Sequence, residues 1–170
     1  DVYVSIIPFS KDVNVGASNY NASWIDWTDW DNKNQTCSGG GGWGGWGGGG
    51  NQTCTPKSHS TWNGCVTDRG GSSGPDANNY DQKVDAPGTT AASKFPAEQY
   101  DSCPLTMMGL NYNWTAMNSL VDQMYPDGNT NQPIGLVWAW QSLVGGGPLT
   151  APAKDSNYTY TDVIILMSDG

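Results

Sequence analysis

Thr161-Asp-Val-Ile-Ile-Leu-Met-Ser-Asp-Gly170 is the segment from which the architecture is inferred. Residues Val163 to Met167 form a continuous apolar run rich in β-branched side chains, which is typical of a strand covered on both faces. Ser168-Asp-Gly170 then places a hydroxyl, a carboxylate and a turn residue at the C-terminal end of that strand. Because ligands of open α/β sheets bind at this end of the strands, the segment predicts a buried strand that leads into a binding site.

Both ends of the sequence lie inside such structural patterns. The chain begins without Met, directly before a second strand-like run at Val2–Phe9, and it stops within the Ser-Asp-Gly turn. Lys11–Gly16 alternates apolar and polar residues, which indicates a short edge strand. We therefore expect an internal fragment of a longer protein, with part of the fold and part of the site outside it.

Composition indicates one domain with many turns. The chain has 170 residues, of which only 14% are charged and 23 are Gly. Asp, Asn, Gly and Ser favour turns over helix interiors, so we expect long loops and a modest core. The net charge of −9 argues against nucleic acid and anionic membrane surfaces as partners, and it is compatible with cation binding.

The four cysteines predict disulfides. They lie in polar, loop-like sequence, none forms a Cys-x-x-Cys pair, and the single histidine, His59, is not spaced for a zinc site. An even number of cysteines in such loops indicates an oxidising compartment. Of the three possible pairings we favour the nearest-neighbour one, Cys37–Cys54 with Cys65–Cys103.

Residues 17–105 form a long, turn-rich region rich in Trp. The tetrapeptide Asn34-Gln-Thr-Cys37 recurs at Asn51-Gln-Thr-Cys54 and brackets a Gly/Trp tract at Ser38–Gly50. We interpret the tract as a flexible loop tip tied at its base by a disulfide. The alternative is a stacking platform in which Trp43 and Trp46 bind a sugar ring or a membrane interface. The remaining indoles of the region are expected to form a small satellite core, namely Trp24, Trp27, Trp30 and Trp62.

Residues 106–170 return to an ordinary α/β pattern. Trp114, Met117, Val121 and Met124 follow helical spacing, so we expect a helix over 114–124 whose apolar face packs on a sheet, capped by Asn113. A second helix is expected over 132–143, with Pro133 in its first turn, and the sequence from Gly145 to Pro148 ends it.

The order of these elements resembles a von Willebrand factor A domain, a Rossmann-like α/β fold. In that family a divalent cation sits above the sheet, held by an Asp-x-Ser-x-Ser loop, a Thr in a Gly-x-Thr turn and an Asp in a Ser-Asp-Gly turn. Gly128-Asn-Thr130 and Ser168-Asp-Gly170 match the last two, and the first is not in this chain. The resemblance implies Mg²⁺ or Mn²⁺ bound by Thr130 and Asp169, with Gly128, Asn129, Ser168 and Gly170 as supporting turn residues. The alternatives are a helix N-cap for Thr130 and a plain turn residue for Asp169.

A closer resemblance covers nearly the whole chain outside the Gly/Trp tract. Its motifs are Val4-Ser-Ile-Ile-Pro-Phe-Ser10, Trp24-Ile-Asp-Trp27, Trp62-Asn-Gly-Cys-Val-Thr-Asp-Arg69, Phe95-Pro-Ala-Glu-Gln-Tyr100 and Cys103-Pro104. These are similar to TadG-like proteins of the bacterial tight-adherence system, which assembles Flp pili. The resemblance implies a partial von Willebrand factor A-like core at 1–16 and 106–170 and a disulfide-containing insertion at 17–105. It also implies a membrane anchor outside the fragment, an extracytoplasmic location, and other pilus-assembly or surface proteins as partners.

Three functions are compared. The resemblance favours a non-enzymatic, divalent-cation-dependent interaction or adhesion domain. A hydrolase using Asp169 and His59 is the second; the chain has no Gly-x-Ser-x-Gly, His-Glu-x-x-His or P-loop pattern, and His59 lies in polar loop sequence where we expect it to be solvated. The third is a carbohydrate-binding module that uses the Trp-rich insertion.

Overall fold

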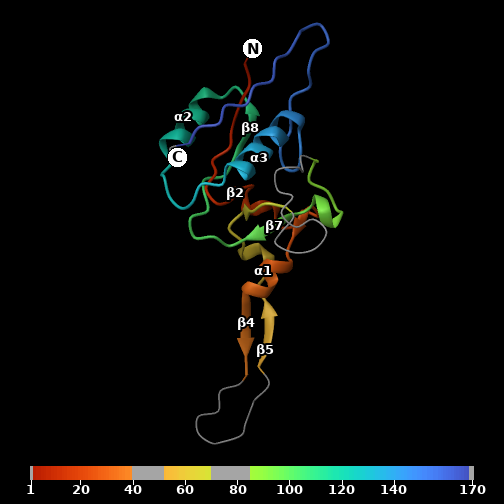
Figure 1. The fold of residues 1–170 in the computed structure, drawn as a ribbon, viewed down its shortest axis with the longest axis vertical. Helices are drawn as coiled ribbons and strands as arrows, with labels where there is room; N and C mark the ends of the chain where they lie inside the picture. Colours follow the sequence, from red (N-terminus) through yellow and green to blue (C-terminus); the bar gives the residue numbers. More distant parts are fainter. Residues whose placement is uncertain (1, 40–51, 70–84, 169–170) are drawn as a thin grey trace, which may run out of the picture.

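The computed structural model describes residues 2–39, 52–69 and 85–168 (Figure 1). The described part is a mixed α/β structure with three small sheets. Its strands are β1 (Val4–Ile6), β2 (Val13–Asn14), β3 (Ile25–Asp26), β4 (Gln35–Ser38), β5 (Thr53–Pro56), β6 (Cys65–Val66), β7 (Phe95–Glu98) and β8 (Met108–Asn111). Its α-helices are α1 (Thr28–Lys33), α2 (Trp114–Asp122) and α3 (Gln132–Val144), and its 3₁₀ turns are Ala17–Asn19, His59–Thr61 and Ala91–Ser93.

The strands pair largely in antiparallel fashion. β1 pairs with β8, and β4 pairs with β5 as a hairpin. The third sheet has the order β2-β6-β7-β3, in which the β3–β7 pair is parallel. The expected strands at Val2–Phe9 and Lys11–Gly16 are therefore present in shortened form, but they belong to two different sheets.

One hydrophobic core contains residues from both regions that the sequence analysis treated as separate, the insertion at 17–105 and the core at 1–16 and 106–170. Trp30, Trp62 and Phe95 of region 17–105 are buried in the same cluster as Ile134 and Trp138 of α3. The rings of Phe95 and Trp138 lie 4.7 Å apart between centroids. The expected satellite core of indoles is thus part of the main core, because α3 packs directly against the region 17–105.

Both helices predicted from spacing and capping are present. The side chain of Asn113 accepts a hydrogen bond from the Ala116 amide at 3.0 Å and caps α2 as expected. The helix α3 carries Pro133 in its first turn and ends at Gly145. At Gly135 an added Cβ would come within 2.7 Å of the Phe9 ring, so this glycine allows α3 to approach the chain after β1 closely.

The predicted packing of α2 is mostly wrong. Met117 is buried, but Trp114 is 54% exposed and Val121 is 53% exposed. No described sheet covers the face that these side chains share, so a helical apolar pattern here produces a surface helix with a solvent-facing apolar stripe.

The predicted buried strand at Val163–Met167 is also not formed. These residues have no regular secondary structure, and Ile165 and Met167 are 79% and 80% exposed. A strand needs a neighbour that accepts and donates backbone hydrogen bonds, and none of the described strands pairs with this segment. Strong β propensity alone therefore leaves it extended and open to solvent.

The structure has the two disulfides that the cysteine spacing favoured. Cys37 and Cys54 stand opposite each other in the β4–β5 hairpin, which projects from the body (Figure 1). Cys65–Cys103 lies against the core, where Cys65 is fully buried. The hairpin forms the expected base of the Gly/Trp tract, whereas Trp43 and Trp46 lie outside the described residues.

Candidate functional site

The predicted Gly128-Asn-Thr130 turn lies at the surface, directly before α3. Gly128 has a φ of 82°, which favours glycine, and an added Cβ would come within 3.0 Å of Ser102. Asn129 and Thr130 are exposed. The cap of α3 is Asn131, whose side-chain oxygen accepts a hydrogen bond from the Ile134 amide, so the alternative role of Thr130 as N-cap is wrong.

Asn131 fixes this turn to the chain after β1. Its amide N–H donates to the carbonyl of Ser10 at 2.8 Å, and its side-chain Nδ2 donates to the carbonyl of Lys11 at 3.1 Å. The same Nδ2 group donates to the carboxylate of Asp68. The backbone beside Thr130 is therefore held by three contacts, although Thr130 itself is exposed.

The other half of the predicted cation site is only partly described. Ser168 is exposed, and Asp169 and Gly170 lie outside the described residues. Within the described ranges, no group of His, Cys, Asp and Glu side chains is arranged to hold a metal ion. The structure thus positions one of the two predicted ligands, Thr130, and a single hydroxyl does not hold Mg²⁺.

A buried carboxylate, Asp12, and a half-buried one, Asp68, lie near the turn. Asp12 is fully buried, and neither of its carboxylate oxygens has a hydrogen-bond partner among the described contacts. This burial raises its pKa to about 6, against the opposing charge of Lys11. Burial also raises the pKa of Asp68, although its hydrogen bond from Asn131 opposes the change. These groups were not singled out from the sequence, because nothing in the alternating pattern around Asp12 shows that this polar position is enclosed.

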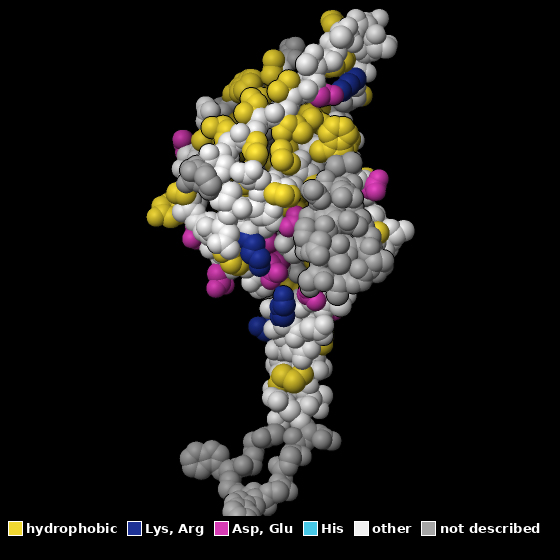
Figure 2. Space-filling model, in the orientation of Figure 1, with side chains coloured by type: hydrophobic (Ala, Val, Ile, Leu, Met, Phe, Trp, Pro, Cys, Tyr) yellow, Lys and Arg dark blue, Asp and Glu magenta, His cyan; other side chains and the backbone are white. Residues whose placement is uncertain are grey.

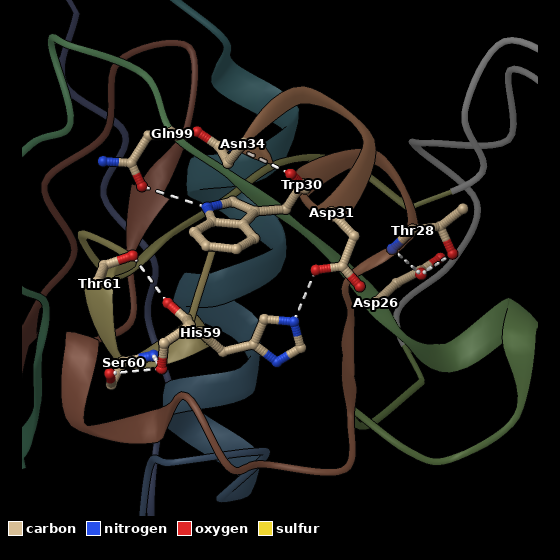
Figure 3. Close-up of polar contacts among 10 residues, drawn as sticks. Asp26, Thr28, Trp30, Asp31, Asn34, His59, Ser60, Thr61 and Gln99 are labelled. Carbon is tan, nitrogen blue, oxygen red and sulfur yellow. Dashed lines mark hydrogen bonds and ion pairs between the residues drawn. The ribbon is translucent and has the colours of Figure 1, made fainter. Parts of the chain in front are cut away.

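His59 is held in a cluster of aromatic side chains, contrary to the solvated position expected for it. Its imidazole stacks on Trp27 with ring centroids 3.8 Å apart and 8° between the planes. Its Nε2 lies 2.8 Å from a carboxylate oxygen of Asp31 (Figure 3). Trp27 and Asp31 are one helical turn apart at the start of α1, a spacing that could have suggested a shared face.

An imidazole oriented by a carboxylate is a pattern that general-base catalysis uses, so the neighbouring hydroxyls matter. Ser58 and Ser60 hydrogen-bond to each other at 2.8 Å, and among the described contacts neither hydroxyl bonds to the His59 ring. The arrangement therefore joins α1 to the 3₁₀ turn at His59–Thr61, and it lacks a paired nucleophile within the described residues.

Three of the four described indoles of the insertion contact one another, and the fourth, Trp24, packs against Trp138 of α3. Trp27 meets Trp30 and Trp62 edge to face, with centroids 5.4 and 5.3 Å apart. Trp30 and Trp62 are each 2% exposed. Because a sugar stacks on a free aromatic face, these rings are core residues rather than a binding platform.

One surface feature without an assigned role is apolar. We define the apolar face as the exposed apolar residues of α2 and the turn that follows it, of α3 and of the C-terminal segment Val163–Met167. In Figure 2 apolar side chains gather over the upper half of the molecule, where a few charged side chains also lie, whereas most of the visible Asp, Glu, Lys and Arg side chains lie around its middle and above the hairpin. The residues of the apolar face are Trp114, Val121, Met124, Leu136, Trp140, Val144 and Val163–Met167.

No protein-family model, curated protein or solved structure matches this chain. The two disulfides indicate an oxidising, extracytoplasmic environment. No helix in the described part of the chain has the length and hydropathy that a transmembrane helix requires.

Proposed function

We propose that the chain is an extracytoplasmic protein-interaction domain of a TadG-like protein that serves assembly of Flp pili in a bacterial cell envelope. The observation that carries this proposal is the apolar face, supported by the disulfides. Monomeric soluble proteins rarely expose a large contiguous apolar surface, and such surfaces mark sites where other proteins bind. The motif resemblance supplies the biological setting, and the proposed partners are other pilus-assembly or surface proteins.

The proposed fold is a partial von Willebrand factor A-like domain. The β1–β8 pair followed by helices α2 and α3, and the position of Val163–Leu166 beside α3, are compatible with it. Cation dependence is the second part of the proposal: Mg²⁺ or Mn²⁺ would be held by Asp169 and Thr130, with remaining ligands from a loop that residues 1–170 do not contain. When bound, such an ion would accept a partner's carboxylate as a further ligand.

The interaction function is preferred to the two alternatives on specific contacts. For a hydrolase, the His59–Asp31 pair lacks a hydroxyl partner among the described hydrogen bonds. For a sugar-binding module, the described indoles of the insertion are packed against each other or against Trp138 of α3. The contacts of His59 therefore do not favour a hydrolase, and the contacts of the indoles do not favour a sugar-binding module.

The interaction proposal is tested in the bacterium that carries the gene. We expect a Trp114→Ser/Trp140→Ser double variant to abolish surface pili, counted by electron microscopy, because it removes two exposed indoles of the apolar face. Lys33→Ser, at the exposed end of α1, is the control and should leave pili unchanged. Normal pili in the double variant, at wild-type protein levels and unchanged melting temperature, would contradict the proposal.

Cation binding is tested separately by titration calorimetry on the complete parent domain. We expect Asp169→Ala to weaken Mg²⁺ binding at least tenfold and Thr130→Ala to weaken it less, because a carboxylate contributes charge and a hydroxyl does not. Asp155→Ala, in an exposed turn, is the control. Equal Mg²⁺ affinity in wild type and Asp169→Ala would remove the cation from the proposal and leave a metal-free interaction domain.

A further inference from the structure

The β4–β5 hairpin carries an exposed disulfide, Cys37–Cys54, which we call the hairpin bridge. The two cysteines stand directly opposite each other in the antiparallel register. Because side chains alternate between the two faces of a strand, Gln35 and Pro56 share the face of the bridge, and the Thr and Ser side chains of the hairpin lie on the other. The hairpin projects at the opposite end of the molecule from α2 and β8 (Figure 1). A thiol in solution can therefore reach the bridge while the protein is folded.

The second disulfide, Cys65–Cys103, has different surroundings, and we call it the core bridge. Cys65 is fully buried and Cys103 is half-buried. The strand that holds Cys65, β6, lies between β2 and β7, and Cys65 pairs with Glu98 of β7. A thiol reaches the sulfur of Cys65 only after part of the core has opened, so the folded structure protects this bridge.

The hairpin also differs in charge from the rest of the chain. Residues 32–67 contain no Asp or Glu, although the chain has 16 such residues. The same stretch contains Lys33 in the last turn of α1 and Lys57 directly after β5. A disulfide is attacked by a thiolate anion, and lysines favour thiolates. The charge distribution therefore favours exchange at the hairpin bridge over exchange at the core bridge, which lies beside Glu98.

The base of the hairpin is attached to the core by contacts other than the disulfide. The Lys57 amide donates to the carbonyl of Asn34 at 2.8 Å. The amide and the side-chain Nδ2 of Asn34 both donate to the carbonyl of Trp30, at 2.8 and 3.0 Å. The Trp30 side chain is 2% exposed. Opening the hairpin bridge therefore leaves the base of the hairpin and the core in place.

We propose that the hairpin bridge is a redox switch, which a dithiol reductant opens in the folded protein while the core bridge stays closed. Exposed disulfides are the reducible and regulatory ones. An isolated two-stranded hairpin is at best marginally stable in water, so β4 and β5 separate beyond the Asn34–Lys57 contact once the bridge is open. The redox state thus decides whether the hairpin projects as a paired arm. This inference goes beyond the proposed function and does not depend on it.

The reaction is a thiol–disulfide exchange in two steps. One thiolate of the reductant attacks a sulfur of the bridge, forms a mixed disulfide with that cysteine and releases the other cysteine as a thiolate. The second thiolate of the reductant then displaces the first cysteine. Two electrons pass to the bridge, the reductant becomes a disulfide, and the two protons of its thiols pass through solvent to Cys37 and Cys54.

The test treats the folded 170-residue chain with dithiothreitol and then alkylates free thiols with N-ethylmaleimide. We expect peptide mapping to find Cys37 and Cys54 alkylated at least tenfold faster than Cys65 and Cys103. Far-UV circular dichroism and tryptophan fluorescence should keep the folded signal, while hydrogen exchange should speed up at the amides of β4 and β5. Cys37→Ser/Cys54→Ser is the control, since it should release no thiol under the same conditions.

Three results would overturn the proposal. The first is reduction of both bridges at equal rates in the folded chain, or alkylation of the core cysteines first. The second is a hairpin bridge that dithiothreitol opens only in guanidinium, or whose opening unfolds the core, because the bridge would then be structural. The third is unchanged hydrogen exchange in β4 and β5 after selective reduction, which would mean that the bridge does not control their pairing.

Discussion

At the scale of single residues, Asp12 is the clearest case of a side chain whose environment opposes its charge. It is fully buried and its pKa is raised to about 6 from 3.8. Because the folded-state pKa lies above the unfolded one, the native state favours the protonated form. Asp12 therefore supports stability below about pH 4, loses this effect as the pH rises to about 6, and destabilises the fold at neutral pH.

We expect Asp12→Asn to raise the free energy of unfolding at pH 7 by about 1–3 kcal/mol, since two pKa units correspond to about 3 kcal/mol. The advantage over wild type should shrink between pH 6 and pH 4. Urea unfolding followed at pH 4, 5, 6 and 7 measures it. A constant difference across this range would show that Asp12 stays ionised in the fold. Lys11, Glu98 and Asp68 also act on this carboxylate, so Asp68→Asn is the companion variant.

His59 offers a second residue-level prediction, because its stacking on Trp27 and its hydrogen bond with Asp31 make separable contributions. The side chains of His59 and Asp31 are 35% and 33% exposed, and such pairs contribute about 0–1 kcal/mol. Aromatic contacts add about 0.5–1.5 kcal/mol beyond area burial. We expect His59→Ala to destabilise the fold by about 1–2 kcal/mol and His59→Phe to restore most of that loss in thermal unfolding. Equal losses in both variants would make the Asp31 contact the dominant one.

At the scale of elements, the two disulfides differ in what they connect. Cys37–Cys54 joins two exposed strands of a projecting hairpin, whereas Cys65–Cys103 joins β6 of the core to the chain after β7. In the chain-entropy model loops of 17 and 38 residues both give about 3–4 kcal/mol. That estimate applies in full only where the loop closes part of the cooperative core.

We therefore expect Cys65→Ser/Cys103→Ser to lower the free energy of unfolding by about 3 kcal/mol or more. Cys37→Ser/Cys54→Ser should lower it by less than about 1 kcal/mol, because the hairpin buries little apolar surface and can open locally. Guanidinium unfolding of the two double variants decides this. A similar large loss in both would show that the hairpin folds together with the core.

The same contrast explains which elements could be predicted from the sequence. Asn113, Pro133 and Gly145 act through local backbone chemistry, so the helices that they cap, begin and end were found in place. The segment Val163–Met167 has equally clear local signals, yet its strand is not formed. A strand depends on a partner elsewhere in the chain, and no local pattern reports whether that partner is present.

The residues of the candidate site also fall into two groups: those set by local backbone chemistry and those set by long-range contacts. The Gly128-Asn-Thr130 turn is where a turn was expected, since glycine at positive φ is a local requirement. The enclosure of Asp12 and the stacking of His59 on Trp27 depend on contacts between segments tens of residues apart. Such contacts cannot be predicted from local sequence patterns, because they form only when the fold brings these segments together.

At the scale of the whole molecule, the shared core bears on how the chain unfolds. The division into a core at 1–16 and 106–170 and an insertion at 17–105 would predict two separable units. In the structure the Trp138 ring of α3 contacts both Phe95 and Trp24, with centroids 4.7 and 5.9 Å apart. Buried contacts of this kind couple the two parts into one cooperative unit.

We therefore expect one unfolding transition, with coincident midpoints by far-UV circular dichroism and tryptophan fluorescence. Ile134→Val, in α3, should cost about 1 kcal/mol and Val66→Ala, in β6, about 2 kcal/mol, because both side chains are fully buried. Each should move the single midpoint for both probes. Two resolved transitions, with Val66→Ala shifting only one of them, would mean that residues 17–105 unfold independently. The contacts across Trp138 would then be an interface between two domains rather than the centre of one.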